Sequence, residues 1–173
     1  YSLSTPELRN LDKRFTFRAE ELYYKPSYNI APTQKVLTVT GNVERQGQYM
    51  RWGILPFWAK TEKNRYSMFN ARDDKLLEST VFAPLMLARR CLIIADGFYE
   101  WKKERDGSKT PVRITLNGGE PFAFAGLWSP WTDPDTDETI KTCTIITTSP
   151  NELISRIHER MPAILPYEAE EIW

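Results

Sequence analysis

Most of the chain carries short apolar runs, or apolar residues that alternate with polar ones. These segments are rich in β-branched and aromatic side chains, a pattern typical of β-strands. We expect strands over residues 36–40, 49–54, 91–95, 98–103, 111–116, 122–128, 139–147 and 162–165. Glycine-containing turns at 106–108 and 117–119 separate three of these strands. This spacing predicts antiparallel hairpins.

Helical segments are predicted to be short. Ser4-Thr5-Pro6-Glu7 has the form of a capping box with proline in the first turn, so we expect a helix over 6–14. A second capping box at 149–152 predicts a helix over 150–157 that ends beside His158. Further helical character is found at 71–79, in 82–90 from near Pro84, and at 167–173. This mixture predicts an α+β fold: a single domain of mainly antiparallel β-sheet, with a barrel-like core and short peripheral helices.

Length and charge narrow the classes of function. The 173 residues suit one domain, and 23 basic and 23 acidic side chains leave no net charge. A global basic field for nucleic acid is therefore absent, while a local basic patch is not excluded. The apolar runs are too short to cross a bilayer and the chain starts without a signal-peptide pattern, so no membrane partner is expected.

The cysteines and the histidine bear on compartment and metal binding. Cys91 and Cys143 lie in strand-like runs, and we interpret them as free buried thiols of a cytoplasmic protein. A disulfide between neighbouring strands is the alternative. A single histidine and the lack of a Cys-x-x-Cys pair argue against a metal site.

The segment Ala95-Asp96-Gly97-Phe98-Tyr99-Glu100-Trp101 is the strongest candidate for chemistry. It follows an apolar strand, bends at Gly97, and then places Glu100 between two large aromatic residues. Desolvation by aromatic neighbours raises the pKa of a carboxyl group and makes it a usable acid or base near neutral pH. His158 is the other candidate for proton transfer.

Several polar residues outside regular structure are flanked by apolar or aromatic ones. Such groups are either hydrogen-bonded locally or serve a ligand. They are Asn29, Asn70, Arg72, Glu100, His158 and Arg160. The local alternatives stay open here: asparagine forms turns, histidine caps the end of a helix, and a glutamate on an alternating strand faces solvent. Trp58, in a proline-containing loop beside Lys60, suits stacking on nucleobases.

Seven blocks follow one another along the chain in a recognisable order. They are residues 27–34, 51–59, 70–72, 90–102, 122–128, 144–148 and 158–165, and they include Asn70-Ala71-Arg72 and His158-Glu159-Arg160. This series resembles the SRAP family, the SOS response-associated peptidase-like proteins, over nearly the whole chain. Any one block is unspecific, but seven in order make the resemblance specific.

The resemblance implies a function in DNA damage. Members of this family recognise abasic sites in single-stranded DNA and cap them as a DNA–protein crosslink. The nucleophile is a cysteine that becomes the first residue after removal of the initiator methionine. Its α-amine, with a pKa near ~7.7–8.0, attacks the open-chain sugar aldehyde, and its thiol then closes a thiazolidine ring. The resemblance also implies a self-processing peptidase activity, no cofactor, a monomer, and a bacterial cytoplasmic location at the nucleoid.

The resemblance assigns roles to residues of this chain. Glu100 supplies a proton to the departing hydroxyl, and Asn70 orients the amine or the sugar. His158 assists proton transfer to the ring-opened sugar and reversal of the crosslink. Arg72 and Arg160 hold phosphates. The other DNA-binding residues that it implies are Asn29, Pro32, Trp58 and Trp101, of which the last three pack on bases or sugar beside the gap.

The start of the chain departs from the family pattern. The family begins Met-Cys-Gly-Arg, followed by an aromatic residue, and here that aromatic residue is Tyr1. We therefore expect that the chain, residues 1–173, is one domain trimmed at both ends. Neither Cys91 nor Cys143 can replace the nucleophile, because neither has a free α-amine.

A second departure follows the Asn-Ala-Arg block. Thr80 and Val81 stand where some relatives carry an arginine, so one phosphate contact is either absent or supplied elsewhere, with Arg89 and Arg90 as candidates. Two other functions stay open: a peptidase on the same scaffold, and a single-strand DNA-binding module without chemistry.

Overall fold

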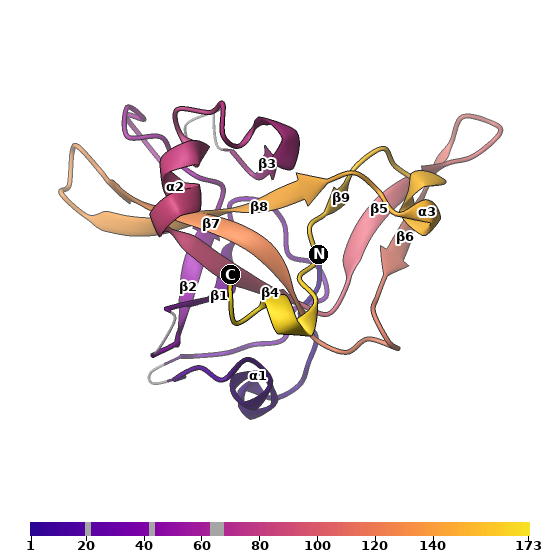
Figure 1. Ribbon diagram of the computed structural model, residues 1–173, viewed down its shortest axis with the longest axis horizontal. Helices are drawn as coiled ribbons and strands as arrows, with labels where there is room; N and C mark the ends of the chain where they lie inside the picture. The colour runs from indigo at the N-terminus through magenta and orange to yellow at the C-terminus, as the bar shows by residue number, and fades with distance from the viewer. Residues whose placement is uncertain (20–21, 42–43, 63–67) are drawn as a thin grey trace.

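The computed structural model describes residues 1–19, 22–41, 44–62 and 68–173 (Figure 1). Strand pairing forms a five-stranded ring at its centre. The ring follows the order β2-β1-β4-β7-β8 and closes because β8 also pairs with β2. Its strands are β1 (Lys35–Thr40), β2 (Gln46–Trp52), β4 (Arg90–Ala95), β7 (Phe122–Thr132) and β8 (Thr139–Thr148). Four of the five neighbouring pairs in the ring are antiparallel, whereas β2 runs parallel to β8. Closure leaves these five strands without a free edge along the ring.

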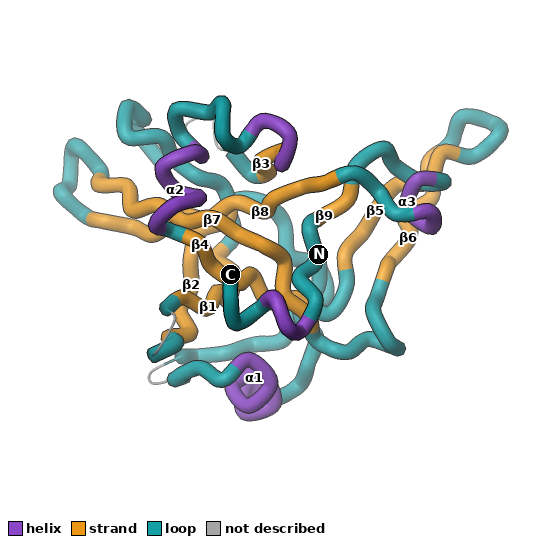
Figure 2. Tube along the Cα trace, in the orientation of Figure 1, coloured by secondary structure: helices purple, strands orange, loops and turns teal. Residues whose placement is uncertain are grey.

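Shorter elements are attached around one end and the sides of this barrel (Figure 2). Two strands, β3 (Asn70–Arg72) and β9 (Met161–Pro162), extend the sheet along β8. A separate hairpin of β5 (Phe98–Lys103) and β6 (Lys109–Ile114) projects from the barrel. The helices are α1 (Leu8–Phe15), α2 (Phe82–Ala88) and α3 (Glu152–Ser155), with single 3-10 turns η1 (Asp73–Lys75) and η2 (Tyr167–Ala169).

Buried rings and aliphatic side chains fill the barrel. Phe124 is fully buried and contacts the rings of Tyr1, Phe98 and Phe122 edge-on, with centroids 5.2–6.1 Å apart. Helix α1 joins the same core through Leu11 and Phe15 because these residues lie four apart on one helical face. The α+β fold with a barrel-like core, predicted from the strand pattern, is confirmed.

The two cysteines are buried free thiols, as the strand pattern predicts. Burial raises the pKa of both Cys91 and Cys143, so neither is a thiolate at neutral pH. No helix in the described part of the chain is long and apolar enough to cross a bilayer.

One of the two predicted hairpins is wrong. The turn at 106–108 does join antiparallel strands, β5 and β6. The turn at 117–119, however, connects β6 to β7, and these strands belong to different sheets. After Leu116 the chain leaves the small hairpin and enters the barrel, where β7 pairs with β4 and β8 instead.

The helix predictions were too long, and two of their caps were wrong. Helix α1 begins at Leu8, because the hydroxyl of Ser4 donates to Asp96 rather than capping the helix. Helix α3 is capped by Asn151, whose side chain accepts from the N–H of Ile154. The segments 71–79 and 167–173 contain only single 3-10 turns, because strand pairing takes the start of the first of them.

Candidate functional site

A pocket of about 360 Å³ opens at the end of the barrel where β3, β5 and β8 meet the loop before β9. Its polar lining consists of Asn70, Arg72, Glu100, Thr147, His158 and Arg160. Its floor is aromatic and is formed by Tyr1, Trp52, Phe98 and Phe124. Charged and polar groups therefore converge over an apolar base, the usual composition of a small-molecule or nucleotide site.

Strand register explains why Asn70 and Arg72 face the pocket together. In β3 they lie two apart, on one face of the strand, while Ala71 between them is fully buried on the other face. The parallel pairing with β8 places Asn70 opposite Ile145 and Arg72 opposite Thr147, and both partners also line the pocket.

Glu100 reaches the pocket by the same alternation on β5. Phe98, two residues earlier, packs its ring 6.1 Å from that of Phe124 and so directs this face of the strand toward the barrel. Trp101 lies on the opposite face and is 57% exposed. Glu100 is partly buried and its carboxyl group is desolvated, as the sequence predicts, and Tyr99 lines the same pocket. Trp101 does not line it, because successive side chains of a strand point to opposite faces.

Burial raises the pKa of Glu100 above its usual value. The positive charge of His158 and the backbone N–H of Trp101 act in the opposite direction, but they do not outweigh the desolvation. A carboxyl group in this state holds its proton closer to neutral pH than an exposed glutamate does, so it is suited to general acid–base work.

His158 is oriented by its own loop. Its Nδ1 atom lies 3.0 Å from the carbonyl oxygen of Arg160 and 3.1 Å from the backbone nitrogen of the same residue. Because Nδ1 is engaged by the backbone, Nε2 is the ring nitrogen that can serve a ligand in the pocket. His158 therefore does not cap the carbonyls of α3 through its side chain, which was the local alternative.

Each arginine of the pocket is held by an aspartate of η1. Arg72 donates two hydrogen bonds to Asp74, at 3.0 and 2.8 Å. Arg160 donates to Asp73 at 2.6 Å and to the carbonyl oxygen of Thr147 at 2.5 Å. Hydrogen bonds from Thr148 and then Arg160 lower the pKa of Asp73, so this carboxylate stays charged at neutral pH.

Sequence reasoning missed these two aspartates. The signal was present, because they follow Asn70-Ala71-Arg72 directly, but nothing local shows that Arg160 folds back onto Asp73. Among the described residues, the Nε atom of Arg160 is buried and has no hydrogen-bond partner. This arginine is thus oriented through Nη2, which donates both hydrogen bonds, and its Nε donor is unused.

Four of the predicted DNA-binding residues lie outside the pocket. Trp101 is exposed on the outer face of β5, and Trp58 is 51% exposed with its ring edge-on to Phe57 at 4.9 Å. Asn29 and Pro32 are exposed in the segment before β1. Arg89 and Arg90, the candidates for a further phosphate contact, do not line the pocket either; they lie over the rings of Trp128 and Trp173.

Tyr1 lines the pocket, so the chain begins at the candidate site, where the resemblance to the family places the nucleophile. The ring of Tyr1 lies 5.3 Å from that of Trp52 and 5.6 Å from that of Phe124 in the pocket floor. Figure 1 shows the start of the chain beside β9, and Met161 and Pro162 of that strand line the same pocket. Five predicted residues (Asn70, Arg72, Glu100, His158 and Arg160) are therefore assembled around the first residue of the chain.

The chain belongs to the SOS response associated peptidase (SRAP) family, which it matches over residues 1–173. It is 49% identical over 152 residues to the abasic site processing protein YoqW of Bacillus subtilis, covering 87% of this chain and 67% of that protein. It is 34% identical over 182 residues to the abasic site processing protein HMCES of Gallus gallus, covering 87% of this chain and 54% of that protein. The chain thus spans about two thirds of the bacterial relative and about half of the vertebrate one.

The fold also matches a crystal structure of a protein from Bacteroides thetaiotaomicron. The TM-score is 0.82 at 30% identity, and the match covers 99% of this chain and 78% of that one.

Glu100→Gln is expected to stabilise the folded protein by about 0.5–1 kcal/mol at pH 7. The folded site raises the pKa of this carboxyl group, so it disfavours the charged form that predominates at neutral pH. The gain disappears below about pH 4, where the carboxyl group is protonated in both the folded and the unfolded state. Urea unfolding of both proteins at the two pH values measures this difference. A variant that is less stable at pH 7 would show that contacts in the site favour the carboxylate.

Proposed function

We propose that this protein binds single-stranded DNA at abasic sites and caps them through a covalent thiazolidine crosslink. The nucleophile is an N-terminal cysteine that precedes Tyr1 in the natural protein. The observation that carries the proposal is the pocket itself: Asn70, Glu100 and His158 surround the place where the chain begins. The names of the relatives, abasic site processing proteins, support the same reading.

The chemistry needs three groups around one sugar carbon. The neutral α-amine adds to the aldehyde carbon of the ring-opened sugar and gives a carbinolamine. Glu100 donates its proton to the carbinolamine hydroxyl, which leaves as water, and the nitrogen then returns a proton to the Glu100 carboxylate to give a neutral imine. The thiol sulfur then adds to the imine carbon, and its proton passes to the ring nitrogen. Asn70 orients the amine or sugar, while Nε2 of His158 exchanges protons with the sugar hydroxyl on opening and on reversal.

The surroundings of the pocket suit a single strand. Arg72 and Arg160 lie at its rim for phosphate contacts, and the half-exposed rings of Trp58 and Trp101 are available for stacking. Asn29 and Pro32 complete the proposed DNA-binding set along the segment before β1. We further propose that the protein acts as a monomer in the bacterial cytoplasm at the nucleoid, and that it exposes its own cysteine by peptide cleavage.

The test uses the full-length protein with its natural start. We expect it to form a heat-stable adduct with an abasic single-stranded oligonucleotide, with the mass of protein plus DNA less water, by denaturing gel and intact mass spectrometry. The matched control replaces the N-terminal cysteine with alanine, which retains the amine but cannot close the ring. An undiminished yield of heat-stable adduct from that control overturns the proposal, and DNA binding without any adduct from the wild type leaves a binding module instead.

Arg160→Ala is expected to weaken binding to single-stranded DNA of any sequence. Loss of one phosphate contact should also reduce the slope of log K against log salt by about 0.7. Fluorescence anisotropy over a salt series measures both quantities. Arg9→Ala is the control, because Arg9 is exposed on α1 and paired with Glu7, outside the pocket. An unchanged slope for Arg160→Ala would show that this side chain serves the fold alone.

A further inference from the structure

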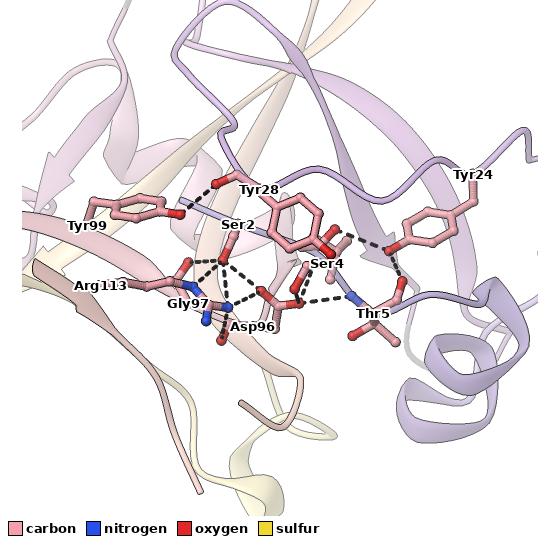
Figure 3. A network of polar contacts seen from close by, with 10 residues as sticks. Ser2, Ser4, Thr5, Tyr24, Tyr28, Asp96, Gly97, Tyr99 and Arg113 are labelled. Atoms are coloured by element: carbon pink, nitrogen blue, oxygen red, sulfur yellow. Dashed lines mark hydrogen bonds and ion pairs between the residues drawn. The ribbon is translucent and has the colours of Figure 1, made fainter. Parts of the chain in front are cut away.

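The mechanism proposed above leaves one buried carboxylate unused. Asp96 follows β4 directly, is only 2% exposed, and does not line the pocket. Figure 3 shows that its oxygens face the first residues of the chain. A buried charge is retained only when hydrogen bonds and an opposite charge compensate it, so the contacts of Asp96 indicate what it does.

The contacts of Asp96 are with one short segment and one cation. Oδ1 accepts from the hydroxyl of Ser2 at 2.7 Å and from Nη2 of Arg113 at 3.1 Å. Oδ2 accepts from the N–H and the hydroxyl of Ser4, the latter at 2.8 Å, and from the N–H of Thr5 at 3.0 Å. Burial alone would raise the pKa of Asp96, but hydrogen bonds from Ser2, Ser4 and Thr5 outweigh it and lower the pKa. The group is therefore a carboxylate at neutral pH.

The segment that it holds runs as a strand into the site. The N–H of Ser2 donates to the carbonyl of Gly97, and the carbonyl of Ser2 accepts from the N–H of Asp96. Leu3 exchanges two backbone hydrogen bonds with Ser27, and the Tyr1 carbonyl accepts from Ile30. Side chains alternate along it: Tyr1 and Leu3 enter the core, while Ser2 points to Asp96. The direction in which the chain leaves Tyr1 is thus determined by these few residues.

Arg113 closes the cluster from β6, and Gly97 makes the space for it. A Cβ atom at Gly97 would lie 2.8 Å from Nε of Arg113 and 3.0 Å from Oγ of Ser2. Arg113 donates to that hydroxyl at 3.1–3.2 Å as well as to Asp96. Because β5 begins at Phe98, the same cluster connects the start of the chain to the strand that carries Glu100.

We propose that Asp96, with Arg113, is a positioning residue that aims the N-terminal amine at the pocket. This inference rests on the proposed function. The pair acts through residues 2–5 and touches neither DNA nor the reacting atoms. Its contribution is to hold the nucleophile near the aldehyde carbon, where an error of about 1 Å costs on the order of 10²-fold in rate.

Asp96→Asn tests the proposal, because it keeps the size of the side chain but removes its charge and one acceptor oxygen. We expect the single-turnover crosslinking rate at saturating abasic DNA to fall about 10–100-fold. The dissociation constant for DNA should change less than about 3-fold, since the pocket rim is untouched. Hydrogen exchange at the amides of residues 2–5 should become faster, while exchange in β4 and β7 stays slow. Asp106→Asn is the control, since Asp106 accepts from Ser108 in the exposed turn of the β5–β6 hairpin.

A second pair of variants serves if Asp96→Asn fails to fold. Ser2→Ala removes only the hydroxyl between Asp96 and Arg113, and should slow crosslinking by about 3–10-fold at unchanged DNA affinity. Arg113→Lys should retain more of the rate than Arg113→Ala. A crosslinking rate equal to wild type in a variant whose residues 2–5 exchange freely overturns the positioning role. If the wild type forms no adduct, the proposed function fails, whereas the exchange measurement still reports on the anchoring of residues 2–5.

Discussion

Glu100→Gln is expected to slow formation of the crosslink by about 10²–10⁴-fold while the affinity for abasic DNA stays within a few-fold. Glutamine has the shape of the acid but no proton to give to the carbinolamine hydroxyl, so water loss becomes slow. Single-turnover gel assays at saturating DNA separate this chemical step from binding.

The pH dependence gives the same prediction a second readout. Glu100 donates as the protonated acid, so the wild-type rate should fall as pH rises through its raised pKa. Deprotonation of the N-terminal amine acts in the opposite direction and gives the rising limb. In the Gln variant the falling limb should be absent and the rising limb should remain.

Glu104→Gln is the matched control for Glu100→Gln. Glu104 lies just beyond β5, pairs with Lys102 and does not line the pocket. It should crosslink at the wild-type rate. Equal rates for Glu100→Gln and the wild type would remove Glu100 from the mechanism and leave the α-amine and solvent to do the chemistry.

Phe124→Ala is expected to destabilise the protein by about 3–5 kcal/mol. The ring is fully buried and contacts Tyr1, Phe98 and Phe122, so truncation leaves a cavity in the centre of the barrel. Urea or guanidinium unfolding measures the loss, which corresponds to a fall in Tm of about 10 °C for a domain of this size.

Phe57→Ala removes the same atoms from a side chain that is 90% exposed, and should change the unfolding free energy by less than about 0.5 kcal/mol. The difference between the two variants isolates burial from residue type. A loss below about 1 kcal/mol at Phe124 would show that the barrel closes around the cavity and that the pocket floor is deformable.

Most strands of the barrel could be predicted, because each has its own sequence pattern of alternating or continuous apolar residues. Strand β5 was predicted over the residues that it occupies, and β1, β4 and β8 each to within one residue at one end. Helices were less predictable. Ser4 stands in a sequence typical of a helix cap, but its hydroxyl donates instead to the buried carboxylate of Asp96, 92 residues away.

The site divides in the same way. Glu100 and His158 are recognisable along the chain because one stands in an aromatic segment and the other is the single histidine. Their convergence with Asn70 cannot be recognised along the chain, because it depends on the parallel pairing of β3 with β8 and on the loop before β9. Asp74 stands close to Arg72 in the sequence, whereas the pairing of Asp73 with Arg160 joins residues 87 apart and has no local signal.

Residue types and their order were enough to predict a β-rich fold and its family, and to select candidate groups for the chemistry. Which strands become neighbours, which carboxylate is desolvated and which one holds the first residues of the chain came from long-range pairing. Alternation along a strand predicts which face of the sheet a side chain is on, but not which residues of other elements pack against that face. The raised pKa of Glu100 and the hydrogen bonds that Asp96 accepts both depend on residues distant in the sequence, which become neighbours only in the folded protein.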